Sequence, residues 1–223
     1  MTYSRILADW KSQRKMEMLW RKQSALWTGK DESRWLGWLD IVKQQQHRLG
    51  EFAKIQKQFM KYETVAVLGM GGSSLCPEVL AKTFEAVEGF PRLFILDSTD
   101  PLQVKSFQKK LSLDKNCFIV SSKSGSTLEP NIFLEYFHET APGHFIAITD
   151  PGSSLEKRAR NLKFLDVFYG RSSSKAKSGW VSLYLAIRLA HSWRSLDPLL
   201  PKFSEKFCLT PSGIRNFSFS GHP

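Results

Sequence analysis

The sequence has few cysteines and histidines, and their positions exclude several common kinds of site. The three cysteines, Cys76, Cys117 and Cys208, are odd in number and widely separated, and no Cys-x-x-Cys pair occurs. The five histidines likewise show no spacing typical of metal ligands. We therefore expect no disulfide framework, no metal site and no other cofactor.

Long hydrophobic runs are also absent. No stretch approaches the roughly 20 consecutive apolar residues that a membrane-spanning helix requires. The first ten residues lack the basic-then-apolar pattern of a signal peptide. We therefore expect a cytoplasmic protein without a membrane partner. The apolar content of 42%, with seven Trp and sixteen Phe in 223 residues, is sufficient to fill a hydrophobic core.

Acidic residues are scarce, and the 32 basic against 21 acidic side chains give a net charge of +11. The excess is uneven along the chain. Residues 1–62 contain 13 basic and 6 acidic residues, residues 63–168 contain 11 and 13, and residues 169–223 contain 8 and 2. Because the charge lies on the flanks rather than on the central segment, we expect no nucleic-acid partner.

The central segment alternates between short apolar runs and longer stretches with helical spacing. The predicted strands cover residues 64–70, 93–96, 117–120, 144–149 and 164–168. The predicted helices cover residues 77–87, 101–111, 131–140 and 154–161. This alternation predicts an α/β fold, a five-stranded parallel sheet with helices on both faces, preceded by N-terminal helices. Ligands bind such sheets at the C-terminal ends of the strands.

A hydroxyl-rich turn over residues 121–130 follows the third predicted strand. Short hydroxyl side chains, backbone N–H groups and the positive end of a helix dipole converge there, which favours a phosphate group without a metal. The alternative is a Ser-rich loop that only caps the following helix. Thr127 is suited to the N-cap and Pro130 to the first turn. Capping does not, however, account for the density of hydroxyls.

A glycine-rich turn over residues 69–74 follows the first predicted strand. Its sequence is Gly-Met-Gly-Gly-Ser-Ser, and Ser74 stands where a dinucleotide-binding fingerprint has its third glycine. Gly71 and Gly72 would let a ligand approach the backbone closely, and Ser73 adds a hydrogen-bond donor, which suits a sugar hydroxyl or a phosphate. The alternative is a tight turn needed only for strand-to-helix geometry. The occurrence of two such turns at neighbouring strand ends favours one shared pocket.

Together the two turns resemble those of the glucose-6-phosphate isomerase family and of the wider sugar-isomerase (SIS) domain. The resemblance rests on residues 69–73, on Ser-Lys-Ser-Gly-Ser-Thr-Leu-Glu at 122–129, and on Ile-Thr-Asp-Pro-Gly-Ser-Ser-Leu at 148–155. It is greatest to the bacterial type also found fused to a transaldolase, and it covers roughly residues 1–168. The implied fold is a flavodoxin-like SIS domain. The implied ligands are glucose 6-phosphate and fructose 6-phosphate.

The resemblance also implies a set of substrate-binding residues. These are Gly72, Ser73, Ser122, Lys123, Ser124, Ser126 and Thr127. The first two would contact the sugar, and the hydroxyls of the second turn would hold the 6-phosphate. Lys123 would add positive charge near the phosphate or face solvent, and Glu129 would be structural.

The catalytic groups of the family are not found. Aldose–ketose isomerisation through an enediol requires a positioned carboxylate base. In the family this base lies in a Glu-Ser-x-Gly-Lys motif, and the sequence has no such motif. The family's ring-opening histidine and C-terminal lysine belong to a second domain. We therefore expect no catalytic residue in this chain, which would be an apparently truncated enzyme of glycolysis and gluconeogenesis that binds a carbohydrate derivative without turnover.

The predicted organisation has three parts. Residues 1–62 form a helical lead-in, residues 63–168 the SIS phosphosugar-binding domain, and residues 169–223 a divergent basic, Ser-rich tail. Within this tail a helix over residues 180–193 is open, and little order is expected after Pro198. A homodimer and association with a missing C-terminal domain are both open. Two other functions also remain, a noncatalytic sugar-phosphate-binding regulator and a nucleotide-binding α/β module in which Asp97 would bind the ribose.

Overall fold

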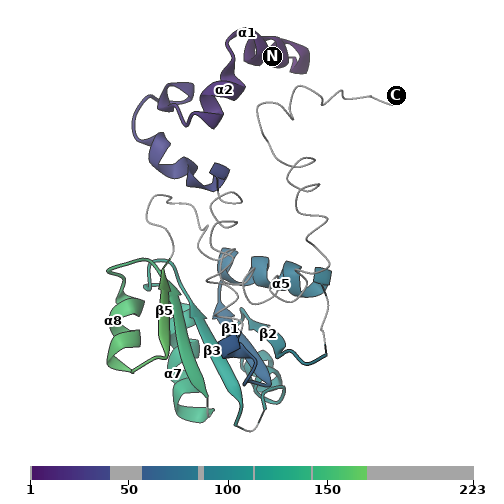
Figure 1. The fold of residues 1–223 in the computed structure, drawn as a ribbon, viewed down its shortest axis with the longest axis vertical. Helices are drawn as coiled ribbons and strands as arrows, with labels where there is room; N and C mark the ends of the chain where they lie inside the picture. The colour runs from purple at the N-terminus through teal and green to yellow at the C-terminus, as the bar shows by residue number, and fades with distance from the viewer. Residues whose placement is uncertain (1, 41–56, 85–87, 113, 142, 170–223) are drawn as a thin grey trace.

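The computed structural model describes residues 2–40, 57–84, 88–112, 114–141 and 143–169 (Figure 1). The tail predicted over residues 169–223 thus lies outside the described residues, apart from Tyr169. Short helices make up the N-terminal part. They are α1 (Tyr3–Ser12), α2 (Lys15–Trp20), and the 3-10 helices η1 (Ser24–Leu26) and η2 (Glu32–Asp40).

The described residues after position 63 include the five strands of a single sheet. Its strands are β1 (Thr64–Gly69), β2 (Arg92–Leu96), β3 (Asn116–Ser121), β4 (His144–Thr149) and β5 (Asp166–Tyr169). All neighbours are parallel, and the spatial order is β2-β1-β3-β4-β5. This confirms the predicted flavodoxin-like α/β fold. The strand order reverses between β1 and β3, which is the point where doubly wound sheets bind ligands.

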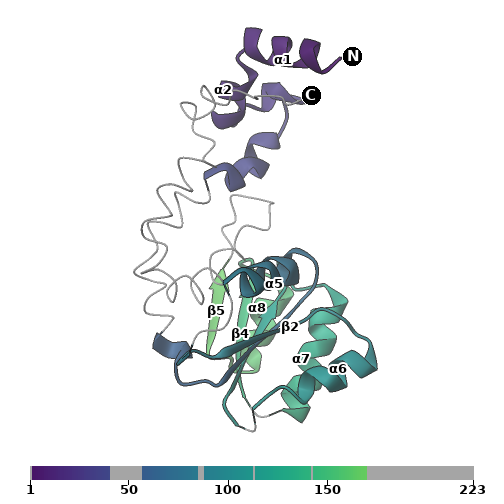
Figure 2. The same ribbon diagram turned by 90° about the vertical axis from the view of Figure 1, so that its right-hand side faces the viewer.

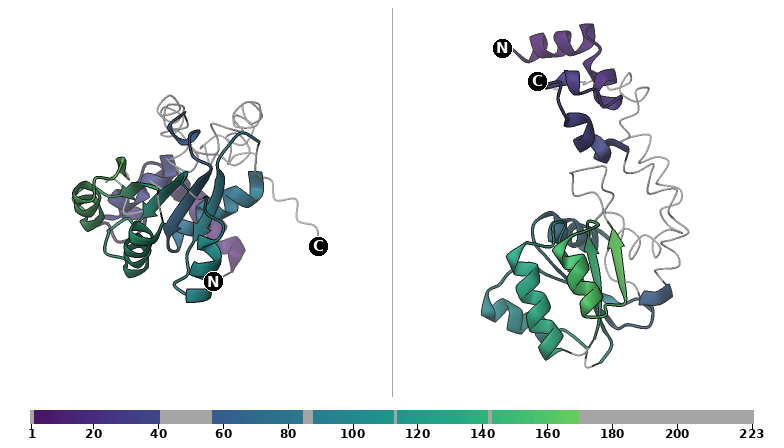
Figure 3. Two further views of the ribbon diagram at one scale, coloured as in Figure 1. Left: turned by 90° about the horizontal axis from the view of Figure 1, so that it is seen from below. Right: turned by 90° about the vertical axis from the view of Figure 1, so that its left-hand side faces the viewer.

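Helices connect successive strands. They are α5 (Gly72–Phe84), α6 (Pro101–Gln108), α7 (Leu128–Thr140) and α8 (Ser154–Asn161). Figures 2 and 3 show α7 running alongside the strands, with α6 and α8 beside it. The connection through α5 runs in the reverse direction across the sheet, from β1 to β2. A right-handed crossover therefore places α5 on the opposite face from α6, α7 and α8.

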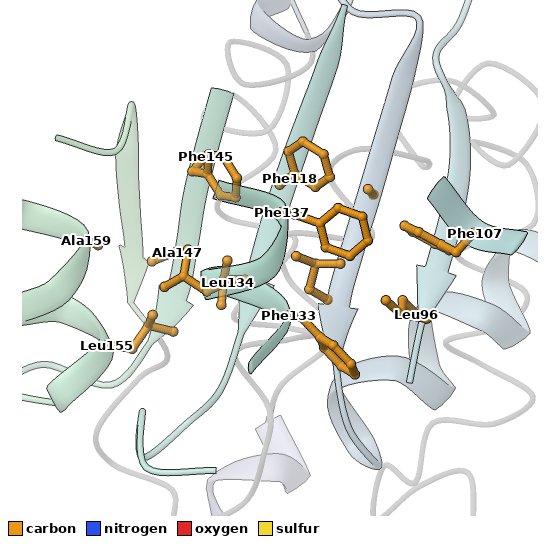
Figure 4. Packing of buried hydrophobic residues seen from close by; sticks show 13 residues of the cluster. Leu96, Phe107, Phe118, Phe133, Leu134, Phe137, Phe145, Ala147, Leu155 and Ala159 are labelled. Atoms are coloured by element: carbon orange, nitrogen blue, oxygen red, sulfur yellow. The ribbon is translucent and has the colours of Figure 1, made fainter. Parts of the chain in front are cut away.

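The core beneath α6, α7 and α8 is rich in phenylalanine (Figure 4). Phe118 of β3 stacks on Phe137 of α7 with ring centroids 5.4 Å apart, and on Phe145 of β4 at 4.8 Å. Phe107 of α6 meets Phe137 edge to face at 5.7 Å. Each buried phenylalanine contributes about 2 to 3 kcal/mol through loss of apolar surface from water. This packing fixes α7, and with it the loop that precedes α7, against the sheet.

The predicted start of α5 at residue 77 is wrong, because the helix begins at Gly72. Gly71 has a positive φ of 55°, a conformation that glycine adopts without strain. Its carbonyl accepts hydrogen bonds from the N–H groups of Ser74 and Leu75, which closes the first turn. Pro77 therefore lies inside the helix. The consequence for the site is that Ser73 belongs to the first turn of α5 rather than to a loop.

Other boundaries differ from the predictions by a few residues. Helix α7 begins at Leu128 rather than at residue 131, and α6 ends at Gln108 rather than at 111. Strand β5 begins at Asp166 rather than at 164.

In the part of the chain that the structure describes, no helix is both long enough and apolar enough to span a bilayer.

Candidate functional site

The two sequence turns meet at the C-terminal edge of the sheet, between β1 and β3. Gly69 and Ser121 are paired in the parallel register. A Cβ atom at Gly69 would lie 2.9 Å from Cβ of Ser73 and 3.1 Å from Cβ of Ser121. Only glycine therefore fits at this position. The close approach brings the first turn of α5 next to the loop that leaves β3.

The loop over residues 122–127, here called the hydroxyl loop, gathers its side-chain oxygens in pairs. The Ser122 hydroxyl donates to Oγ1 of Thr127 at 3.3 Å, and the hydroxyls of Ser124 and Ser126 lie 2.8 Å apart. The backbone N–H of Gly125 donates to Oγ of Ser122, and that of Ser126 donates to Oγ of Ser124. The loop thus brings four hydroxyls together in two pairs.

Thr127 occupies the N-cap of α7, but its side chain makes no capping hydrogen bond. Instead its hydroxyl faces Ser122 within the loop. The first N–H groups of a helix have no partner within the helix, and the helix dipole makes this end positive. The hydroxyl loop therefore presents oxygens and helix N–H groups to the same region. The side-chain capping bond from Thr127, which the alternative interpretation of this sequence expects, is not made.

Gly125 allows the hydroxyl loop to pack against the start of α8. Its φ of +70° lies in the left-handed region, a backbone conformation that residues with a Cβ adopt only with strain. A Cβ at this position would collide with the backbone nitrogen of Leu155 and would lie 2.7 Å from Oγ of Ser154. The loop and the N-terminal end of α8 are thus in direct contact.

The turn between β4 and α8 also holds the hydroxyl loop. The backbone N–H of Asp150 donates to the Lys123 carbonyl at 3.0 Å, and the Thr149 hydroxyl donates to the same carbonyl at 3.1 Å. The Thr149 hydroxyl also lies 2.6 Å from that of Ser153, which caps α8 by accepting from the Glu156 N–H. One carbonyl of the loop is thereby fixed from the neighbouring strand.

The Lys123 side chain extends toward a carboxylate. Its Nζ lies 3.9 Å from Oδ2 of Asp150, and both side chains are about 30% exposed, at 28% and 31%. Burial raises the pKa of Asp150 above its usual range, and the nearby Lys123 ammonium opposes that rise. Positive charge beside the hydroxyl loop is therefore partly balanced by Asp150.

Sequence reasoning missed Asn131 and Arg158. The Asn131 side-chain amide donates to the Gly125 carbonyl at 2.9 Å and to the Thr127 carbonyl at 2.7 Å. Its oxygen accepts from Nη1 of Arg158, on α8, at 2.9 Å. No sequence pattern indicated this pair, because residues 131 and 158 are brought together only by the packing of α7 beside α8.

The predicted contact residues differ in accessibility. Ser73 and Ser122 are buried, with 7% and 3% exposed, whereas Ser124 and Ser126 are exposed. Gly72 is half-buried at the first position of α5. A ligand at the surface of the loop could therefore reach the hydroxyls of Ser124 and Ser126 directly.

Among the described residues, no group of three or more His, Cys, Asp or Glu side chains could hold a metal ion.

Comparison with known proteins finds relatives in sequence and in fold. No family model matches the chain. The glucose-6-phosphate isomerase of Chlamydia trachomatis serovar A is 29% identical over 208 residues, which cover 81% of this chain and 38% of that protein. The chain thus spans less than half the length of this relative.

Two crystal structures have a similar fold. A hypothetical protein from Thermus thermophilus aligns with a TM-score of 0.67 at 24% identity, covering 89% of this chain and 48% of that chain. A glucose-6-phosphate isomerase from Chlamydia trachomatis D/UW-3/Cx aligns with a TM-score of 0.50 at 23% identity, covering 83% and 39%.

The strand order and the loop after β3 define the class of fold, which is the SIS-type α/β fold of phosphosugar isomerases. The sequence similarity then identifies the particular relationship. Over most of its length the chain is similar to part of the glucose-6-phosphate isomerases, and the resemblance expected from its motifs is confirmed.

Proposed function

We propose that this chain binds a phosphosugar, with the phosphate held by the hydroxyl loop and the start of α7. The observation that carries the proposal is the orientation of Thr127, which sits at the N-cap and yet turns its hydroxyl into the loop. A phosphate monoester accepts hydrogen bonds through several oxygens, and it is stabilised by the positive end of a helix. The hydroxyl loop and the start of α7 supply hydroxyl donors and backbone N–H donors.

The roles of the individual residues are part of the proposal. Ser124, Ser126 and Thr127 donate to the phosphate, while the Lys123 ammonium, 3.9 Å from Asp150, adds positive charge nearby. Ser122 supports the loop from its buried position and donates to Thr127. These roles follow the resemblance to the family and agree with the pairing of the hydroxyls.

The sugar would extend from the phosphate toward the first turn of α5. Gly72 and Ser73 lie there, and Ser73 lies close to the end of β3 through the contact at Gly69. The proposed ligands are glucose 6-phosphate and fructose 6-phosphate, because the relatives with matching sequence are glucose-6-phosphate isomerases. The contacts to the phosphate would be shared by other phosphosugars.

We propose that the chain alone binds without isomerising its ligand. Proton transfer between C1 and C2 requires a positioned base, and this sequence contains no Glu-Ser-x-Gly-Lys motif. The chain would then correspond to the phosphosugar-binding part of a glycolytic isomerase. Its proposed partner is a second copy of the chain or a catalytic domain of the isomerase type, and the cytoplasmic location stays a prediction.

A thermal-shift titration of the purified chain with fructose 6-phosphate tests this function, alongside an isomerase assay of the same preparation. Saturable stabilisation by about 2.7 kcal/mol is expected at a hundredfold excess over the dissociation constant. No turnover is expected. A folded sample without any shift would overturn the proposed site, whereas turnover would show that this chain contains a catalytic base.

A further inference from the structure

Asn131 uses every polar position of its side-chain amide. The two hydrogens on Nδ2 point to the carbonyls of Gly125 and Thr127, at 2.9 and 2.7 Å. The oxygen accepts from Arg158 at 2.9 Å. The opposite orientation of the amide would place its oxygen against two carbonyl oxygens. The pattern of partners therefore fixes the direction of the amide.

The two carbonyls that Asn131 holds belong to the Gly125–Ser126 and Thr127–Leu128 peptide groups. In a trans peptide the carbonyl and the following N–H point in opposite directions. Holding the Gly125 and Thr127 carbonyls toward Asn131 thus directs the N–H groups of Ser126 and Leu128 away from it. The Ser126 N–H points to Oγ of Ser124, which lies in the second hydroxyl pair. The amide thereby sets which way these N–H groups of the site face.

Arg158 connects this arrangement to a different element. Its Nη1 donates to Asn131, while its Nη2 pairs with Glu135, one turn further along α7. The two contacts hold the guanidinium in one orientation across the α7–α8 boundary. The start of α8 already touches the hydroxyl loop at Gly125. The position of α8 is thus linked to the backbone of the loop in two places.

We propose that Asn131, oriented by Arg158, is a positioning residue that directs the backbone N–H groups of Ser126 and Leu128 toward the side of the hydroxyl loop that binds the phosphate of the ligand. The inference rests on the proposed phosphosugar site. Asn131 does not contact the ligand, and its effect passes through the backbone. An aspartate at this position would keep the size and the contact with Arg158. It would also place an oxygen against the two loop carbonyls, which would then turn.

The test is isothermal titration calorimetry with fructose 6-phosphate on the unchanged chain and on three variants. Asn131→Asp and Arg158→Gln each remove part of the arrangement, and the affinity should fall by about tenfold for the former and less for the latter. Tyr136→Phe is the matched control, since it removes one hydrogen bond from α7, to Gln108, on the side away from the loop. Its affinity should equal that of the unchanged chain.

Backbone NMR distinguishes positioning from loss of folding. In folded Asn131→Asp, the amide resonance of Ser126 should shift, while those of β1 and β3 stay in place. Unchanged affinity in folded Asn131→Asp and Arg158→Gln would overturn the inference and leave the proposed function intact. If Asn131→Asp does not fold, the Arg158→Gln result alone decides. No binding by the unchanged chain would overturn both the function and the inference.

Discussion

At the scale of single residues, two glycines of the site region distinguish the cost of a strained backbone from the cost of a steric collision. Gly125 and Gly152 both have φ in the left-handed region, at +70° and +77°. An added Cβ at Gly125 would strike the start of α8, whereas an added Cβ at Gly152 would meet nothing within 4 Å. The same substitution at both positions therefore separates backbone strain from collision.

Gly125→Ala should lower the free energy of unfolding by about 3 kcal/mol, and Gly152→Ala by about 1 kcal/mol, because only the former adds a collision to the strain. The Gly125 variant should also lose affinity for fructose 6-phosphate, since its loop must move. Urea unfolding and calorimetric titration measure the two effects. Equal losses of stability in both variants would contradict the packing of the loop against α8.

At the scale of elements, the first turn of α8 is held by one carboxylate. Glu156 accepts a hydrogen bond from the Gly152 N–H at 2.6 Å and from the Tyr169 hydroxyl at 2.8 Å, and it pairs with Arg160. These hydrogen bonds lower the pKa of Glu156 from 4.5 to about 2. The bond from the Gly152 N–H has the largest effect, followed by those from Tyr169 and Arg160. The folded chain thus favours the charged carboxylate, which joins the turn before α8 to the end of β5.

This lowered pKa predicts an acid-dependent loss of stability. The contribution of Glu156 is fully present above pH 4.5 and is lost as the pH falls toward 2, where the folded chain also takes up the proton. Glu156→Gln should therefore be less stable than the unchanged chain at neutral pH, and the difference should shrink over this interval. Thermal unfolding at a series of pH values measures it.

Glu139→Gln, on the exposed surface of α7, is the control for removing one carboxylate. A difference between Glu156→Gln and the unchanged chain that stays constant from pH 6 to pH 2.5 would contradict the assigned role.

The same scale shows what the sequence could predict. The strands are predictable because β1 and β3 are buried along their whole length and carry continuous apolar runs, over residues 65–68 and 117–120. The start of α5 was misplaced because Pro77 is typical of a first turn, while the helix already begins in the glycine turn. The partnership of Asn131 with Arg158 depends on how two helices pack, which no local pattern encodes.

At the scale of the whole molecule, the parallel sheet brings two turns that are about 50 residues apart in sequence to one edge. The hydroxyls of the loop were predictable from the sequence because they are adjacent in the chain. The contacts that support the loop from β4 and α8 were not predictable from the sequence, because they form only when these elements pack beside the loop. They are made by Asp150, Thr149 and Leu155. The proposed site would hold a phosphate through these oriented hydroxyl and N–H groups.

The central claim is that the hydroxyl loop binds the phosphate of a sugar, and calorimetric titration of the chain with fructose 6-phosphate and with fructose tests it most directly. We expect saturable binding of the phosphorylated sugar alone. Thr127→Val, which removes one hydroxyl at nearly constant volume, should weaken this binding by about tenfold. Equal binding of fructose, or an unchanged affinity in folded Thr127→Val, would contradict the account.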